Sequence, residues 1–149
     1  MTASPPTIRE YDARATTTRT FGRVLAGARD HHIVVDGPVQ NGCLGEAITP
    51  AEMFLAAVAS CGAELVEVIA REEGVPLGTV DVAITGWVDR SNQPRADVTT
   101  FNKVHLDVTL TGVDEPRGRA LVDGFRRRCP LYGTVAAASG EVTVSVRVG

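Results

Sequence analysis

The sequence has few aromatic residues and little excess charge of either sign. Phe, Trp and Tyr make up only 5% of its 149 residues, so its core must be built mainly from Val, Ala and Leu. The formal net charge is -3, which provides no basic field to bind the phosphates of a nucleic acid. We therefore expect small molecules or proteins as partners, and no nucleic acid.

The sequence also lacks the usual patterns of export and of membrane anchoring. Met1 to Pro6 do not show the basic and then apolar pattern of a signal peptide, and there is no lipidation signal. The uncharged run between Glu52 and Glu64 is well short of the roughly 18 apolar residues that suggest a membrane span. The three cysteines are odd in number and too sparse for a disulfide scaffold. We expect a protein of the reducing cytoplasm with no membrane partner.

Length and composition favour a single domain over residues 1–149. A chain of this length with 44% hydrophobic residues and no low-complexity tract can bury a core of its own.

The stretch from Thr49 to Gly74 predicts the helix around which this domain is organised. Thr49 is a suitable N-cap, Pro50 suits the first helical position, and Glu52 completes a capping box. Gly74 can end the helix in a left-handed conformation.

The first half of this helix is apolar on every side, because no charge occurs between Glu52 and Glu64. Such a helix must be covered on every side. A sheet of the same chain can cover one side only, so we expect a homodimer that packs helix against helix.

The remaining pattern predicts strands on both sides of this helix and two further helices. Alternating apolar residues and turn signals divide the chain into these elements. The expected strands are Tyr11 to Thr20, Phe21 to Ala28, His31 to Val35, Val80 to Val88, Val104 to Leu110 and Glu141 to Val148. The expected helices are Asp114 to Arg128 and a short one through Ala138, with Cys129 as its N-cap because Pro130 suits a first helical turn. The order β(3)-α-β(2)-α(2)-β predicts an α+β fold.

Two cysteine motifs in these helices resemble those of a known family. Residues 50–61, PAEMFLAAVASC, resemble the signature helix of the OsmC/Ohr family of osmotically induced and organic-hydroperoxide-resistance proteins. Residues 128–135, RCPLYGTV, resemble its second cysteine motif, and the order of strands and helices agrees over most of the chain. The resemblance implies an intertwined homodimer with two active sites at its interface.

The resemblance also implies a thiol peroxidase. In characterised members the first cysteine, here Cys61, attacks an organic hydroperoxide, and the second, here Cys129, forms a disulfide with it. A dithiol such as dihydrolipoamide then reduces this disulfide, so no cofactor is expected. The chemistry needs a thiolate as the nucleophile and a nearby thiol that traps the sulfenic acid before it is over-oxidised.

Cys61 is expected to need a cation. A thiolate at Cys129 is favoured by its place at a helix N-terminus, whereas Cys61 at mid-helix has no such help. The family supplies an arginine from the N-terminal strands, and Arg19 is its nearest counterpart here. The alternatives are Arg9, Arg14 and Arg23.

In the Ohr peroxidases of this family a glutamate directly after the helix proline holds this arginine, whereas the Pro-x-Glu spacing of this chain resembles the less characterised OsmC-like branch. Here that position is Ala51, and the acid comes one residue later at Glu52. One residue turns a side chain by about 100° around a helix. A capping role and a catalytic role are therefore both open for Glu52.

No metal site is expected, because the histidines and cysteines include no pair with the close spacing of zinc ligands. Cys43, in a loop flanked by glycines, is expected to be a free, exposed thiol.

The alternative to a peroxidase is a dimer that binds an apolar small molecule, with its cysteines acting as redox sensors or only as core residues. Acyl transfer through Cys61 lacks a His near either cysteine motif.

Overall fold

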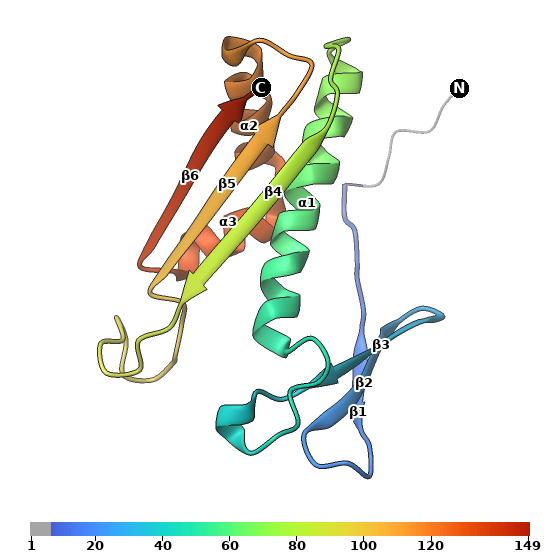
Figure 1. Ribbon diagram of the computed structural model, residues 1–149, viewed down its shortest axis with the longest axis vertical. Coiled ribbons are helices and arrows are strands. Elements are labelled where there is room, and N and C mark those ends of the chain that lie inside the picture. The colour runs from blue at the N-terminus through green and yellow to red at the C-terminus, as the bar shows by residue number, and fades with distance from the viewer. Residues whose placement is uncertain (1–6) are drawn as a thin grey trace. The chain divides into compact units, whose positions relative to one another are not determined.

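Strands and helices follow one another in the order that the sequence predicts, as an α+β fold (Figure 1). The structure is a computed structural model that describes residues 7–149, so the signal-peptide prediction for Met1 to Pro6 lies outside the described residues. The chain divides into two units, Met1–Met53 and Phe54–Gly149. The elements are β1 (Arg14–Thr17), β2 (Arg23–Ala28), β3 (His31–Asp36), η1 (Val39–Asn41), α1 (Pro50–Glu72), β4 (Val80–Trp87), β5 (Lys103–Leu110), α2 (Glu115–Arg128), α3 (Pro130–Ala138) and β6 (Glu141–Val148).

The first unit contains an antiparallel sheet in the order β1-β2-β3. Its first strand is shorter than the predicted Tyr11 to Thr20, because Thr18 begins a turn. The backbone N–H and the hydroxyl of Thr18 both donate to the Arg23 carbonyl, each at 3.0 Å, and the Arg23 N–H donates back to the Thr20 carbonyl at 3.1 Å. Residues 18–23 are therefore a hydrogen-bonded turn instead of two strand ends.

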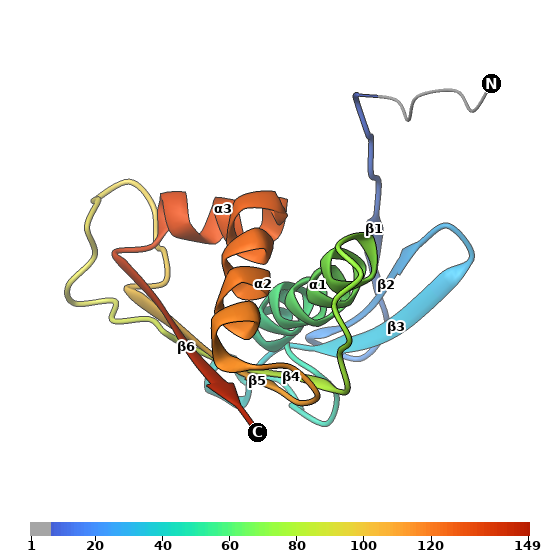
Figure 2. The ribbon, with the colours of Figure 1, turned by 90° about the horizontal axis from the view of Figure 1, so that it is seen from above.

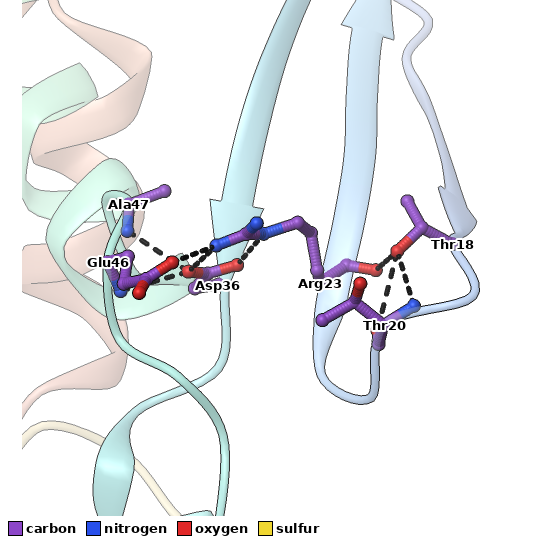
Figure 3. A network of polar contacts seen from close by, with 6 residues as sticks. All are labelled: Thr18, Thr20, Arg23, Asp36, Glu46 and Ala47. Atoms are coloured by element: carbon purple, nitrogen blue, oxygen red, sulfur yellow. Dashed lines mark hydrogen bonds and ion pairs between the residues drawn. The ribbon is translucent and has the colours of Figure 1, made fainter.

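An ion-pair network connects β2 and β3 to the loop that precedes α1 (Figure 3). The Arg23 guanidinium donates to both carboxylate oxygens of Asp36, at 2.8 and 2.9 Å, and to Glu46 at 2.9 Å. The backbone N–H groups of Glu46 and Ala47 also donate to Asp36, at 2.9 and 3.1 Å. The hydrogen bonds from Arg23, and then those from the two backbone groups, lower the pKa of Asp36 to about 2. The charged form of this buried carboxylate is thus the stable one.

We expect Asp36→Asn to destabilise the protein at neutral pH and to matter little near pH 2. Because the pKa of Asp36 is lower in the folded unit than in the unfolded chain, its charge contributes stability above about pH 4. That contribution is lost as the pH falls through the folded value. Urea unfolding followed by circular dichroism at both pH values measures the difference, with the exposed Asp81→Asn as the control. An equal loss at pH 7 and pH 2 would show that the charge is not what matters.

The second unit has a three-stranded sheet with helices on one face, as Figure 2 shows. The strand order is β4-β5-β6, with β4 antiparallel and β6 parallel to β5. Every second residue of β5 is fully buried against the helices. These residues are Val104, Leu106, Val108 and Leu110. Phe125 of α2 has no exposed surface and lies in the same core.

Both predicted ends of α1 are confirmed. The Glu52 carboxylate accepts the Thr49 N–H at 2.8 Å, and the Glu52 N–H donates to the Thr49 hydroxyl at 3.4 Å, which is a capping box. At the other end Gly74 has a φ of 64°, and the Val75 N–H donates to the Ala70 carbonyl at 2.9 Å. These are the left-handed residue and the hydrogen bond of a Schellman motif.

The uncharged half of α1 is buried on one side only in the single chain. Val58 and Gly62 are buried, whereas Ala56 and Ser60 are exposed. By length and composition α1 could cross a membrane, which is equally true of many core helices of soluble proteins. The expectation that this half is covered on every side is therefore not met within one chain.

Candidate functional site

The structure brings together the two cysteines that the sequence singles out. Cys61 lies at the middle of α1, and Cys129 lies between α2 and α3. Their sulfur atoms are 2.7 Å apart, although the residues are 68 positions apart in the chain. All three cysteines of the chain are free thiols. A disulfide between Cys61 and Cys129 can therefore form with little movement of the two side chains.

Cys129 is held by its position between two helices. It ends α2, where its N–H donates to the Phe125 carbonyl at 2.9 Å, and it is also the N-cap of α3. Its sulfur accepts the Tyr132 N–H at 3.3 Å, as the sequence predicts for a residue before Pro130. Only 3% of Cys129 is exposed. The Cys129 sulfur therefore accepts the capping hydrogen bond at the N-terminus of α3.

Two glycines allow α1 and α2 to approach closely enough for the thiols to meet. A Cβ added to Gly62, the neighbour of Cys61, would lie 3.3 Å from the Phe125 ring. A Cβ added to Gly124 would lie 3.0 Å from Ile69 of α1. Both distances are tighter than most Cβ contacts, so a larger residue at either position would require its neighbour to shift by a few tenths of an ångström. The only signal for Gly62 in the sequence is its place beside Cys61.

The surroundings of Cys61 in the second unit disfavour its thiolate. Burial, then the sulfur of Cys129, and then the charge of Glu64 raise the pKa of Cys61 to about 12. Arg128, which precedes Cys129, is engaged elsewhere: its guanidinium donates to both carboxylate oxygens of Glu72, at 2.6 and 3.3 Å. All groups that act on this pKa within residues 54–149 raise it. A reactive Cys61 therefore needs a positive group from outside this unit.

Arg19 and Glu52 belong to the first unit. Arg19 is exposed in the turn before β2, and its side chain makes no hydrogen bond or ion pair among residues 7–149. Of its alternatives, Arg23 is bound to Asp36 and Glu46. The Glu52 carboxylate accepts hydrogen bonds from the N–H and hydroxyl of Thr49, and these bonds lower its pKa. The capping role of Glu52 is thus observed, and its catalytic role stays a prediction.

The prediction that Cys43 is a free thiol is confirmed, whereas the prediction that it is exposed is wrong. Cys43 is partly buried, and its side chain lies against the backbone at Gly22 and Gly37. A Cβ at either glycine would collide with the Cys43 sulfur, so the two glycines make room for it.

Within the part of the chain that the structure describes, no group of three or more His, Cys, Asp or Glu side chains is arranged to hold a metal ion.

A small apolar cavity lies near the N-terminal half of α1, in the second unit. Its volume is about 230 Å³, and its lining is formed by Phe54, Thr100, Phe101, Thr134, Val135, Ala138 and Ser139. The rings of Phe54 and Phe101 are stacked, with centroids 5.8 Å apart. The Thr100 hydroxyl is buried and has no hydrogen-bond partner among the described residues. The cavity is therefore almost entirely apolar.

Comparisons with known proteins agree with this fold. A family model described as "OsmC-like protein" matches residues 44–145. An OsmC-like protein from Mycoplasma pneumoniae has a TM-score of 0.79 at 18% identity, with 94% of this chain and 97% of that chain covered. An organic hydroperoxide resistance protein from Legionella pneumophila has a TM-score of 0.75 at 20% identity, with 95% and 99% covered. An OsmC-like protein of unknown function from Vibrio cholerae has a TM-score of 0.75 at 16% identity, with 93% and 99% covered. No curated protein sequence matches the chain.

Proposed function

Because the chain belongs to the OsmC-like protein family, we propose that it is a thiol peroxidase that reduces organic hydroperoxides through Cys61 and Cys129. The observation that carries this proposal is the 2.7 Å separation of the two sulfur atoms. A nucleophilic cysteine beside a resolving cysteine is the arrangement of a redox-active pair. Some proteins of similar structure are named organic hydroperoxide resistance proteins, which agrees with the proposed substrate class.

The proposed reaction begins at Cys61. Its thiolate attacks one oxygen of the hydroperoxide, so an S–O bond forms, the O–O bond breaks, and the other oxygen leaves as an alcohol after taking up a proton. The Cys129 sulfur then attacks the Cys61 sulfenic acid, and water leaves as the disulfide forms. A dithiol of the lipoyl type reduces the disulfide and becomes a cyclic disulfide itself. This cycle needs a reducing compartment, in keeping with a cytoplasmic protein.

A homodimer is part of the proposal. In the single chain one side of the uncharged half of α1, including Ala56 and Ser60, is exposed. This side has no charged residue that would favour contact with water. A second copy that packs on it would bury this surface. The dimer also offers a source for the cation that the surroundings of Cys61 lack, because each copy carries Arg19 on an exposed turn.

A specific observation favours one alternative, a dimeric protein that binds an apolar small molecule or senses oxidants without peroxidase turnover. The pKa of Cys61 is raised to about 12, and Glu52 is held in its capping box. A thiol in this state is slow to react at neutral pH. In that case the peroxidase site has been lost while the fold has been kept.

Peroxide consumption separates the two functions. We expect the protein to consume cumene hydroperoxide with dihydrolipoamide as the reductant, and to consume hydrogen peroxide more slowly because this oxidant has no apolar group to bind. Loss of hydroperoxide is followed over time with and without the reductant. If neither oxidant is consumed above the rate without protein, the binding or sensing function is the correct one.

A further inference from the structure

The end of α2 carries three consecutive arginines, Arg126, Arg127 and Arg128, immediately before Cys129. The helix dipole favours basic side chains in a last turn, which accounts for their charge but not for the direction in which they point. Arg128 reaches α1, where its guanidinium donates to both carboxylate oxygens of Glu72, at 2.6 and 3.3 Å. Arg127 makes no side-chain hydrogen bond or ion pair among residues 7–149. Arg128 therefore has a contact with α1 that its neighbour does not share.

The other hydrogen bonds that hold Cys129 in place belong to α2 and α3. Its N–H donates to the Phe125 carbonyl, and its sulfur accepts the Tyr132 N–H. Arg126 in turn donates through Nε to the Tyr132 hydroxyl at 3.1 Å, which fixes that residue as well. These bonds fix Cys129 relative to its own two helices, and none of them connects it to the helix of Cys61.

The connection to α1 depends on close packing and on Arg128. α1 and α2 lie side by side (Figure 2), with Gly62 and Gly124 at their contacts. In the part of the chain that the structure describes, the pair of Arg128 and Glu72 is the only ion pair that joins α1 to α2 or α3. Because Arg128 is bonded directly to Cys129, this pair limits how far Cys129 can move away from α1.

We propose that Arg128 and Glu72 form a clamp that positions Cys129 for disulfide formation with Cys61. The two ends of the clamp lie on the two helices that carry the thiols, and a bidentate pair of arginine and carboxylate fixes direction as well as distance. When two reacting groups are held together beforehand, less entropy is lost as the bond between them forms. Arg128 is thus a positioning residue that acts through Cys129. The inference rests on the proposed function, because it concerns the disulfide of that reaction.

The expected effect is moderate, because Arg128 is 45% exposed and Glu72 is 51% exposed. Ion pairs at this exposure contribute measurably when their geometry is bidentate. We expect Arg128→Gln and Glu72→Gln each to make the disulfide about three- to fivefold less stable, which raises its reduction potential by about 14–20 mV. The double variant should equal either single variant, because each removes the same pair. Arg127→Gln is the matched control and should leave the potential unchanged.

Redox titration measures these potentials without any use of peroxidase activity. Every protein carries Cys43→Ser, so that only Cys61 and Cys129 remain, and is equilibrated at pH 7 with mixtures of oxidised and reduced dithiothreitol. In this exchange the two thiols give two electrons and two protons to oxidised dithiothreitol, and the Cys61–Cys129 disulfide forms. Free thiols are then alkylated and counted by mass spectrometry. Circular dichroism checks that each variant is folded.

The direction of the shifts separates a clamp from a simple effect of charge. If Arg128 acted only through its charge on the sulfurs, Arg128→Gln would favour the disulfide, and Glu72→Gln, which frees that charge, would disfavour it. Shifts in opposite directions, single shifts that add in the double variant, or shifts no larger than that of Arg127→Gln overturn this inference alone. A wild-type protein that forms no Cys61–Cys129 disulfide at any ratio of the buffer overturns the proposed function and this inference with it.

Discussion

Cys61→Ser should abolish the reduction of organic hydroperoxides, whereas Cys129→Ser should keep the first turnover and lose the later ones. Removal of a nucleophile typically costs a thousandfold or more, on the order of what serine hydrolases lose in the same way. Without Cys129 the sulfenic acid on Cys61 still forms, but no thiol is in place to resolve it. Excess hydroperoxide should then convert Cys61 to a sulfinic acid, which dithiols do not reduce.

The two variants are measured by single-turnover mixing with one equivalent of cumene hydroperoxide and by mass spectrometry of the Cys61 peptide. Serine is a preferred N-cap residue, so Cys129→Ser should keep the fold of α3, which the Tyr132 N–H bond to the side chain supports. Cys43→Ser is the control for the loss of a thiol outside the site, and it should leave the rate unchanged. If Cys129→Ser also prevents the first turnover while Cys61→Ser does not, the two cysteines have the opposite roles.

Much of this fold could be predicted because local signals agree with the tertiary structure. The capping box of Thr49 and Glu52 and the left-handed Gly74 define α1 from the sequence alone. Pro130 similarly predicts that α3 begins after Cys129. Each of these signals acts within one helical turn, where a side chain competes for a few backbone hydrogen bonds. Such signals need no knowledge of distant residues.

The parts that could not be predicted depend on contacts between distant residues. The 2.7 Å approach of the two sulfurs joins segments far apart in the chain, and only the resemblance to a family suggested it. The tight space at Gly62 is set by the ring of Phe125, which no local pattern reveals. The partial burial of Cys43 between two glycines is of the same kind. In each case the deciding neighbour lies in another element.

Neither the sequence nor the second unit by itself identifies a positive group that stabilises the Cys61 thiolate. Burial and the neighbouring Cys129 raise the pKa of Cys61 to about 12, so this thiol is almost entirely protonated at pH 7. An opposite charge within about 4–6 Å lowers the pKa of a neighbouring acid by roughly 1–3 units. We therefore expect Arg19→Ala to slow the reaction with organic hydroperoxide by about 10- to 1,000-fold at pH 7, with the fold retained, because the rate follows the thiolate fraction.

The pH dependence of Arg19→Ala identifies the cause of this loss. In the wild type the thiolate fraction stops rising once the pH exceeds the pKa that Cys61 has beside Arg19. In the variant it continues to rise, so the rate ratio of wild type to variant should shrink as the pH increases. Arg19→Lys keeps the charge and should keep most of the rate. Glu52→Gln should change the rate little, because glutamine also serves in a capping box.

If the rate ratio of wild type to Arg19→Ala does not change with pH, Arg19 does not act on the ionisation of Cys61. A large loss of rate in Glu52→Gln with unchanged stability would mean that the carboxylate leaves its cap to take part in catalysis. If neither variant changes a measurable rate, Cys61 obtains its thiolate without them. In that case Arg23, whose guanidinium is bound by Asp36 and Glu46, is the next arginine to test, and its loss should also destabilise the first unit.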